Sequence, residues 1–250
     1  MTDKMIYEVC CGSAEDAVQA ARGGADRIEL NTALFLGGLT PSLGALLTVK
    51  RQISVPVMVM VRPREGGFCY SETEYETMKA DAVNFLKAGA DGLVFGFLNG
   101  DGTINARRTA EFVALCGEKE AVFSRAIDVC PDIVGTAHLL ENLGIRRVLT
   151  SGGKASALQG AEKIAELVRD GMNLEILPGG GITPENVREL MYKTGVSQVH
   201  SSARKAEIDT SVQGNPEIFF GGNIFGNYLS ESEYKVTDSA AVAKMRKILG

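Results

Sequence analysis

A repeated pattern runs through this chain: a helical stretch ends at a glycine, one or two polar residues follow, and a short apolar segment begins. It is clearest in GGADRIEL (23–30), AGADGLVFG (88–96), LGIRRVLTSG (143–152) and TGVSQVHSS (194–202). Glycine suits the left-handed conformation that ends many helices, and short apolar runs rich in β-branched residues favour buried strands. The repeat therefore predicts helices and strands in alternation.

Eight strands are expected when the gaps between these four are filled in the same way. The expected strands are IYEVCC (6–11), RIELN (27–31), VPVMVMVRP (55–63), GLVFGF (92–97), AVFSRAID (121–128), RRVLTSG (146–152), LEILPGGG (174–181) and SQVHSS (197–202). Eight strand–helix units in 250 residues match an α/β fold of the TIM, or (β/α)8, barrel type. An open doubly wound sheet is the alternative, but no strong GxGxxG follows the first strand. We expect one domain over 1–250, with a long loop at about 205–235 before the last helix.

The composition excludes several classes of protein. Hydrophobic residues make up 45% and charged residues 23% of the chain, as in ordinary globular proteins. A net charge of −5 offers no basic surface, so we expect no nucleic-acid partner. No apolar run approaches the roughly 20 residues that cross a bilayer, and no signal peptide is visible, so we expect no membrane association. The five cysteines form no CxxC pair, which favours reduced thiols in the cytoplasm over disulfides or structural zinc.

Acidic residues, arginines and a histidine gather where the expected strands end, which is where TIM barrels place their active sites. Residues two apart on a strand share a face, so Glu8 lies on the side of Cys10. The candidates for acid/base chemistry are Glu8, Glu29, Asp128 and His200, and those for holding an anion are Arg62 and Arg64. A buried layer of salt bridges that only stabilises the barrel is the alternative explanation.

Two polar turns are candidates for an anion pocket. PGGGIT (178–183) follows the seventh strand, and HSSAR (200–204) ends the eighth. Free backbone N–H groups at a helix start suit an anion, and these loops commonly hold phosphate in TIM barrels. The expected pocket residues are Gly180, Gly181, Ser201 and Ser202. A tight turn that needs glycine only for its backbone angles is the alternative.

Three cysteines are candidate ligands for a soft metal ion. Cys10 and Cys11 are adjacent, so on a strand their side chains face opposite sides. Cys69 lies in the expected loop after the third strand and is placed to approach Cys10. Two thiolates suit Cu(I), which accepts low coordination numbers. Buried cysteines that serve only as small apolar residues are the alternative.

The chain resembles the CutC family in ordered blocks from the first strand to the last helix. The blocks include EVCCGS (8–13), GGADRIEL (23–30), GGLTPSLG (37–44), VRPREGGFCYS (61–71), RAID (125–128), RVLTSGG (147–153), PGGGIT (178–183) and VHSSAR (199–204). The resemblance implies a TIM-type barrel, a cytoplasmic homo-oligomer of two or more chains, and a role in copper homeostasis with Cu(I) bound through cysteine. Many members have a cysteine where this chain has Asn31, and members commonly have a histidine where it has Ser124.

Two functions therefore stay open. In the first, a copper-homeostasis protein binds Cu(I) through Cys10, with Cys11 or Cys69 assisting. In the second, a barrel enzyme acts on a small anionic metabolite that bears a phosphate or carboxylate group. The expected groups of that enzyme are Glu8, Glu29 or Asp128 as acid/base, Arg62 and Arg64 as an anion clamp, and His200 as an assisting group.

Overall fold

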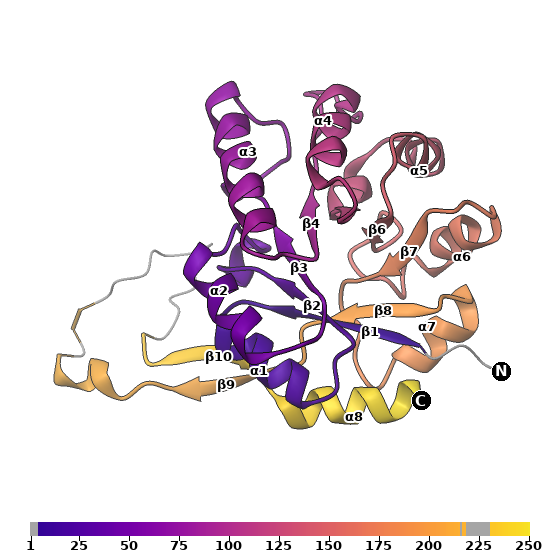
Figure 1. The fold of residues 1–250 in the computed structure, drawn as a ribbon. Coiled ribbons are helices and arrows are strands. Elements are labelled where there is room, and N and C mark those ends of the chain that lie inside the picture. The colour runs from indigo at the N-terminus through magenta and orange to yellow at the C-terminus, as the bar shows by residue number, and fades with distance from the viewer. Residues whose placement is uncertain (1–4, 216, 219–230) are drawn as a thin grey trace.

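The computed structural model describes residues 5–215, 217–218 and 231–250. Eight parallel strands form a nearly closed barrel surrounded by helices, which confirms the predicted TIM-type fold (Figure 1). The strands are β1 (Ile6–Cys11), β2 (Arg27–Leu30), β3 (Val57–Met60), β4 (Gly92–Phe95), β5 (Glu120–Phe123), β6 (Arg147–Thr150), β7 (Glu175–Pro178) and β8 (Gln198–Ser201). They are hydrogen-bonded in the order β7-β6-β5-β4-β3-β2-β1-β8. In this order β1 lies between β2 and β8, so strands from the two ends of the chain are neighbours in the sheet.

The helices of the described part alternate with these strands. They are α1 (Ala14–Arg22), α2 (Leu43–Gln52), α3 (Glu72–Lys87), α4 (Ala106–Cys116), α5 (Ile133–Asn142), α6 (Ala161–Arg169), α7 (Val187–Thr194) and α8 (Ser239–Leu249). Ser13 caps α1 by accepting a hydrogen bond from the Asp16 amide, and the acidic first turn suits the positive end of the helix dipole. None of the described helices is long and apolar enough to cross a membrane.

The glycine turns of the sequence repeat lie between helices and strands. Gly89 follows α3 with φ of 93°, and Gly144 follows α5 with φ of 87°. A residue with a Cβ is strained at these angles, so glycine is favoured there. Each of these short turns reverses the chain between a helix and the strand that follows it.

A charged layer, buried at Arg27, Arg147 and Gln198, lies at the lower end of the barrel. It is formed by the first residues of five strands, Arg27, Glu120, Arg147, Glu175 and Gln198. Arg147 donates to Glu120 at 2.7 Å and to Glu175 at 2.9 Å, and Gln198 Oε1 accepts from Arg147 at 3.1 Å. Above it lies a small apolar layer of Met58, Met60, Val94 and Val122. The barrel thus does contain a salt-bridge layer, at the strand starts, and the strand ends remain a separate polar region.

Local turns set the end of the fifth strand and the start of helix α7. The fifth strand ends at Phe123, and a 3₁₀ helix, η2 (Arg125–Val129), follows it. Asp128 therefore lies on a helical turn and not on the strand expected over 121–128. Helix α7 begins at Val187, because Asn186 accepts from the Thr183 amide and closes a turn before the helix.

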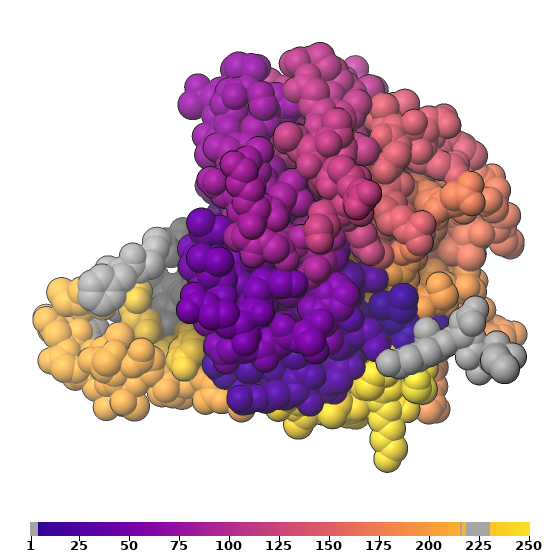
Figure 2. All heavy atoms as spheres, viewed as in Figure 1, coloured from indigo at the N-terminus to yellow at the C-terminus, as the bar shows by residue number. Residues whose placement is uncertain are grey.

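The segment expected as a loop at about 205–235 contains two short strands at its ends. β9 (Arg204–Ile208) pairs antiparallel with β10 (Glu233–Thr237), and a 3₁₀ helix, η3 (Ser211–Gly214), follows β9. Residues 216 and 219–230 of the expected loop lie outside the described residues. β9 and β10 extend sideways from the barrel as a two-stranded ribbon (Figures 1 and 2). Most of its side chains are polar and exposed, so no hydrophobic period marked it in the sequence.

Candidate functional site

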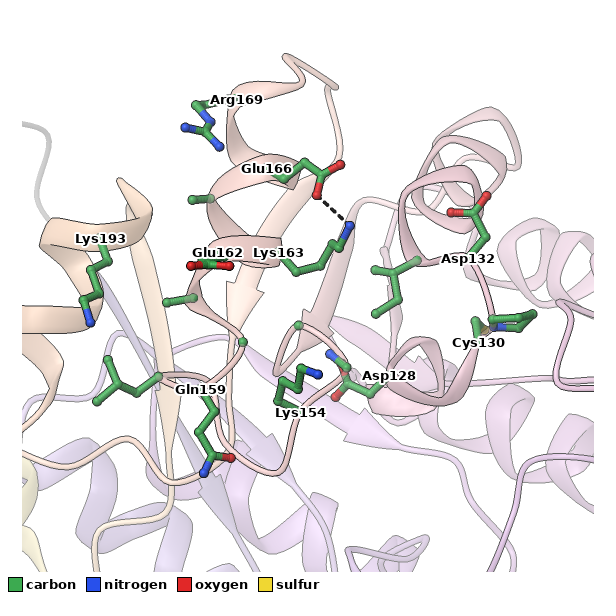
Figure 3. Close-up of a pocket in the computed structure, with 18 residues that line it drawn as sticks. Asp128, Cys130, Asp132, Lys154, Gln159, Glu162, Lys163, Glu166, Arg169 and Lys193 are labelled. Atoms are coloured by element: carbon green, nitrogen blue, oxygen red, sulfur yellow. Dashed lines mark hydrogen bonds and ion pairs between the residues drawn. The ribbon is translucent and has the colours of Figure 1, made fainter.

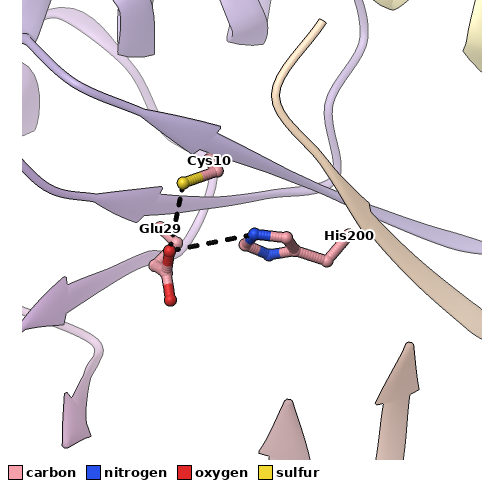
Figure 4. A group of neighbouring side chains, drawn as sticks. All are labelled: Cys10, Glu29 and His200. Atoms are coloured by element: carbon pink, nitrogen blue, oxygen red, sulfur yellow. Dashed lines mark hydrogen bonds and ion pairs between the residues drawn. The ribbon is translucent and has the colours of Figure 1, made fainter. Parts of the chain in front are cut away.

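Cys10, Glu29 and His200 meet inside the upper end of the barrel (Figure 4). They come from the neighbouring strands β1, β2 and β8, and Cys10 is paired with Glu29 in the β1–β2 register. The Cys10 thiol donates to Glu29 Oε2 at 3.3 Å, and His200 Nε2 lies 3.9 Å from the same oxygen. One sulfur, one oxygen and one nitrogen atom therefore lie within 4.8 Å of one another.

Glu8 holds His200 from below. Its Oε1 lies 2.8 Å from His200 Nδ1, and its Oε2 accepts a hydrogen bond from Arg27. Burial alone would raise the pKa of Glu8, but Arg27 and His200 outweigh it and hold the pKa well below its usual range. An ionised Glu8 can only accept, so Nδ1 of His200 carries a proton. The other ring nitrogen, Nε2, then faces Glu29.

Glu29 is a buried acid of which one carboxylate oxygen is hydrogen-bonded and the other is not, among the described residues. Its Oε2 accepts from the Asn31 side chain at 2.8 Å, while its Oε1 has no partner among the described residues. Burial raises the pKa of Glu29, and the negative charge of Glu8 adds to this against the effect of His200. Glu29 therefore takes up a proton more readily than Glu8, whose pKa is lowered.

The cysteines that the sequence singled out occupy three different environments. Cys10 faces the barrel interior, whereas Cys11 packs in the core between the strands and the helices, as strand alternation predicted. Burial, together with nearby carboxylates, raises the pKa of both thiols. Cys69 is exposed in the loop after β3 and is not part of the cluster of metal-ligating atoms found among the described residues. Of the three, Cys10 is the thiol that lies beside other ligating groups.

The two arginines proposed as an anion clamp are engaged by the backbone. Arg62 donates to the carbonyls of Leu36, Gly38 and Gly66 at 2.7–3.1 Å, and its guanidinium lies over the Phe68 ring. Arg64 pairs with Glu74 and donates to three carbonyls of its own loop. Both side chains hold the loops after β2 and β3 in place.

Asp128 accepts hydrogen bonds from several side chains and backbone amides around it. These come from Thr150 Oγ1 at 2.6 Å, the Ser151 amide and hydroxyl, the Gly153 amide, and Arg125 at 2.7 Å. Within the described part of the chain, Glu8 and Glu29 share no hydrogen-bond or ion-pair partner with it. Its carboxylate ties the turn after β5 to the loop after β6.

The predicted anion loops border a pocket of about 300 Å³ between the ends of β7 and β8 and helix α8. Its lining includes Ile182, Thr183, Ser202 and Met245. The Ser201 hydroxyl is bonded to the Tyr7 hydroxyl at 2.7 Å, whereas Ser202 is exposed. Gly180 and Gly181 follow β7 with φ of 102° and 69°.

A larger open pocket of about 1110 Å³ lies outside the barrel, along α5 and α6 (Figure 3). Its rim carries charges of both signs, and Lys163 is paired with Glu166 there. Cys10, Glu29 and His200 are not among its lining residues. The size of this pocket therefore gives no reason to move the candidate site away from the strand ends.

Two residues of the site network carried no signal in the sequence analysis. Arg27 and Gln198 are the first residues of β2 and β8, and they connect Glu8 to the charged layer, with Arg27 donating to Gln198 at 2.8 Å. A polar residue at the first inward-facing position of several strands could have pointed to them.

Comparisons with known proteins place these residues in a family. The sequence pattern of the CutC family matches residues 5–205, which contain all eight barrel strands. The chain is 51% identical over 219 residues to a CutC family protein of Treponema denticola, covering 87% of this chain and 89% of the relative. It is 42% identical over 246 residues to the copper homeostasis protein cutC homolog of Homo sapiens, covering 97% of this chain and 88% of the relative. The solved structure of CutC from Streptococcus agalactiae has a TM-score of 0.75 and 29% identity, covering 79% of this chain and 98% of that one.

Proposed function

The chain belongs to the CutC family, and we propose that it acts in copper homeostasis by binding one Cu(I) ion between Cys10 and His200. One observation carries this proposal: ligating atoms of Cys10, Glu29 and His200 lie within 4.8 Å of one another on three neighbouring strands. The names of the relatives, copper homeostasis proteins, support the choice of metal.

The donor set fits a soft ion. A thiolate and an imidazole nitrogen suit Cu(I), and Cu(I) accepts two such ligands. Glu8 fixes the proton of His200 on Nδ1, which leaves Nε2 as the ligating atom, an arrangement common behind metal-bound histidines. Asn31 stands where a second strand-two thiol would add a ligand, so we propose that Cys10 and His200 are the two principal ligands.

Glu29 has a different task in this proposal. Metal binding requires Cys10 to lose its proton, which burial and the neighbouring carboxylates oppose. The Cys10 thiol already donates to Glu29 Oε2 at 3.3 Å. Glu29 would accept the proton that the Cys10 thiol gives up, so the thiolate would balance the charge of the bound cation and the protonated Glu29 would carry no charge.

A competition titration with a coloured Cu(I) chelator under reducing conditions tests the site. We expect one ion per chain for the wild type, loss of that binding in Cys10→Ser, and weaker binding in His200→Asn. Cys69→Ser is the matched control, because its thiol is exposed and lies outside the cluster. Retention of wild-type Cu(I) affinity by Cys10→Ser would refute the proposal. Loss of Cu(I) binding in Cys69→Ser would show that Cys69, and not His200, is the second principal ligand.

A second candidate function is a barrel enzyme that acts on a small anionic metabolite. Glu29 favours it, because its Oε1 has no hydrogen-bond partner among the described residues, its Oε2 lies 3.9 Å from His200 Nε2, and burial raises its pKa in the direction that a general acid or base requires. In this function Glu29 and His200 exchange a proton with the substrate, Ser201 and Ser202 line the pocket between β7, β8 and α8, and Gly180 and Gly181 lie in the turn just before its lining residue Ile182. Mass spectrometry of small molecules released from the purified protein tests it: a stoichiometric organic anion in place of copper is the expected result, and its absence counts against the enzyme.

We propose further that the chain works in the cytoplasm as a homo-oligomer, as the resemblance to the family implies. Light scattering on the purified protein measures the second part directly: a mass of two or more chains is expected, and a monomer at micromolar concentration would contradict it.

A further inference from the structure

Arg125 presents an oriented guanidinium group at the ends of β5, β6 and β7. Its Nε donates to Asp128 Oδ2 and its Nη2 donates to the Ser151 hydroxyl, each at 2.7 Å. Nη1 makes no hydrogen bond among the described residues, and 41% of the side chain is exposed. Two of the three nitrogens are thus held in place, and the third is available to a ligand.

Arg125 and His200 lie on either side of two consecutive glycines. The position of a Cβ on Gly180 would be 3.3 Å from Arg125 Nη1, and that of a Cβ on Gly179 would be 3.3 Å from His200 Cδ2. Glycine at these positions lets the backbone pass close to both side chains, and Leu149 Cδ1 lies only 2.6 Å from the Cβ position of Gly179. The free arginine nitrogen therefore belongs to the same region as the Cys10–Glu29–His200 cluster.

Backbone donors complete the same region. The amides of Gly180, Gly181 and Ile182 make no hydrogen bond within the described part of the chain, while the preceding Gly179 amide is bonded to Thr150. Gly181 is exposed and Gly180 is partly so. Unpaired N–H groups next to an arginine offer the convergent donors that an oxyanion accepts.

The other arginines of the strand ends are not available for this role. Arg62 uses both terminal nitrogens on the carbonyls of the surrounding loops. Arg64 is occupied by Glu74 and by the loop that it closes. Asp128, which is satisfied by other donors as well, leaves Nη1 of Arg125 uncovered.

We infer that Arg125 recognises the oxyanion group of a small ligand, with Nη1 and the amides of Gly180 and Gly181 as donors. The rest of the ligand then extends toward His200. A phosphate and a carboxylate share the required chemistry. This inference refines the anion pocket of the second candidate function and is independent of copper binding.

Titration of the full-length protein with inorganic phosphate, followed by ³¹P NMR line broadening, tests the inference. Acetate in competition separates the two anion types, and chloride holds the ionic strength constant. We expect saturable phosphate binding whose affinity falls by about tenfold or more in Arg125→Gln, as for a lost charge-assisted hydrogen bond. Displacement by equimolar acetate indicates a carboxylate site, and resistance to it indicates a phosphate site.

Two further variants keep the test decisive. Gly180→Ala adds a methyl group 3.3 Å from Arg125 Nη1 at a position whose φ of 102° strains any residue with a Cβ, so it should displace the proposed amide donors and weaken phosphate binding. Arg64→Gln is the matched control, an arginine of the same face that is held by Glu74, and it should bind phosphate as the wild type does. With folding verified by circular dichroism, unchanged phosphate affinity in Arg125→Gln would overturn the inference, and unchanged affinity in Gly180→Ala would remove the Gly180 amide from the proposed donors.

The copper titration of Arg125→Gln separates this inference from the copper proposal. Loss of phosphate with full Cu(I) binding supports the oxyanion site alone. Wild-type phosphate binding in this variant refutes the oxyanion site whatever the copper result is.

Discussion

Glu8 Oε1 lies 2.8 Å from His200 Nδ1, and the two residues occupy paired positions on β1 and β8. Glu8 also accepts from Arg27, which in turn donates to Gln198. One carboxylate thus links the charged layer at the strand starts to the ligating cluster at the strand ends. The position of the His200 imidazole therefore depends on the charged residues below it.

Glu8→Gln should reduce both stability and metal binding. It removes the negative partner of the buried Arg27, and breaking a buried ion pair costs about 3–5 kcal/mol. It also weakens the hold on His200, so Cu(I) affinity should fall about 10–100-fold, as for other residues behind a metal ligand. Urea unfolding followed by circular dichroism and the chelator titration measure the two effects. Glu166→Gln, at an exposed pair with Lys163, should change stability by less than about 1 kcal/mol, and an equal effect of the two variants would contradict the prediction.

His200 should make the stability depend on pH in a defined direction. Burial alone lowers its pKa, but Glu29 and Glu8 outweigh this, so the pKa in the folded protein is raised. A raised pKa stabilises the folded state fully below the unfolded value of about 6.5, and this contribution is lost as the pH rises through the folded pKa. Glu8, whose pKa is lowered, contributes a constant amount in this range. Urea midpoints of the wild type and His200→Asn from about pH 5.5 to 9 should therefore converge as the pH rises. A constant difference would show that protonation of His200 is not linked to folding.

Gly38→Ala should disturb the site through Asn31. Gly38 has φ of 86°, and a Cβ there would lie 2.5 Å from Asn31 Oδ1. Asn31 would have to move, and with it the hydrogen bonds that it makes to Glu29 and Cys10. Gly171 is the matched control, because its φ of 74° is also positive but a Cβ there meets nothing within 4 Å. We expect Gly171→Ala to cost about 1–2 kcal/mol without affecting Cu(I) binding, and Gly38→Ala to cost more and to weaken it. Equal results for the two would mean that Asn31 does not hold the cluster.

Asp128→Asn should lower stability rather than copper binding. An amide nitrogen in place of one oxygen would face several of the donors that Asp128 now satisfies, at a cost of about 2–4 kcal/mol. Denaturant unfolding should show this loss, and the Cu(I) stoichiometry should stay at one per chain. Because Arg125 is held by Asp128, phosphate affinity should fall as well. A variant as stable as the wild type would show that these hydrogen bonds do not hold the turn.

The sequence by itself determined the barrel, the approximate strands and the side of each strand that faces inward. Glycine turns and strand alternation are local properties, so the opposite orientations of Cys10 and Cys11 and the shared face of Glu8 and Cys10 followed from spacing alone. Only the tertiary structure decided which charges pair. Arg62 and Arg64, predicted to clamp an anion, are engaged by loop carbonyls, and Asp128 left its expected strand because β5 ends at Phe123. Hydrogen-bond partners come from strands and loops that are distant in the chain, and a buried polar group takes whichever donors or acceptors the packing brings within about 3 Å. No spacing rule encodes that choice.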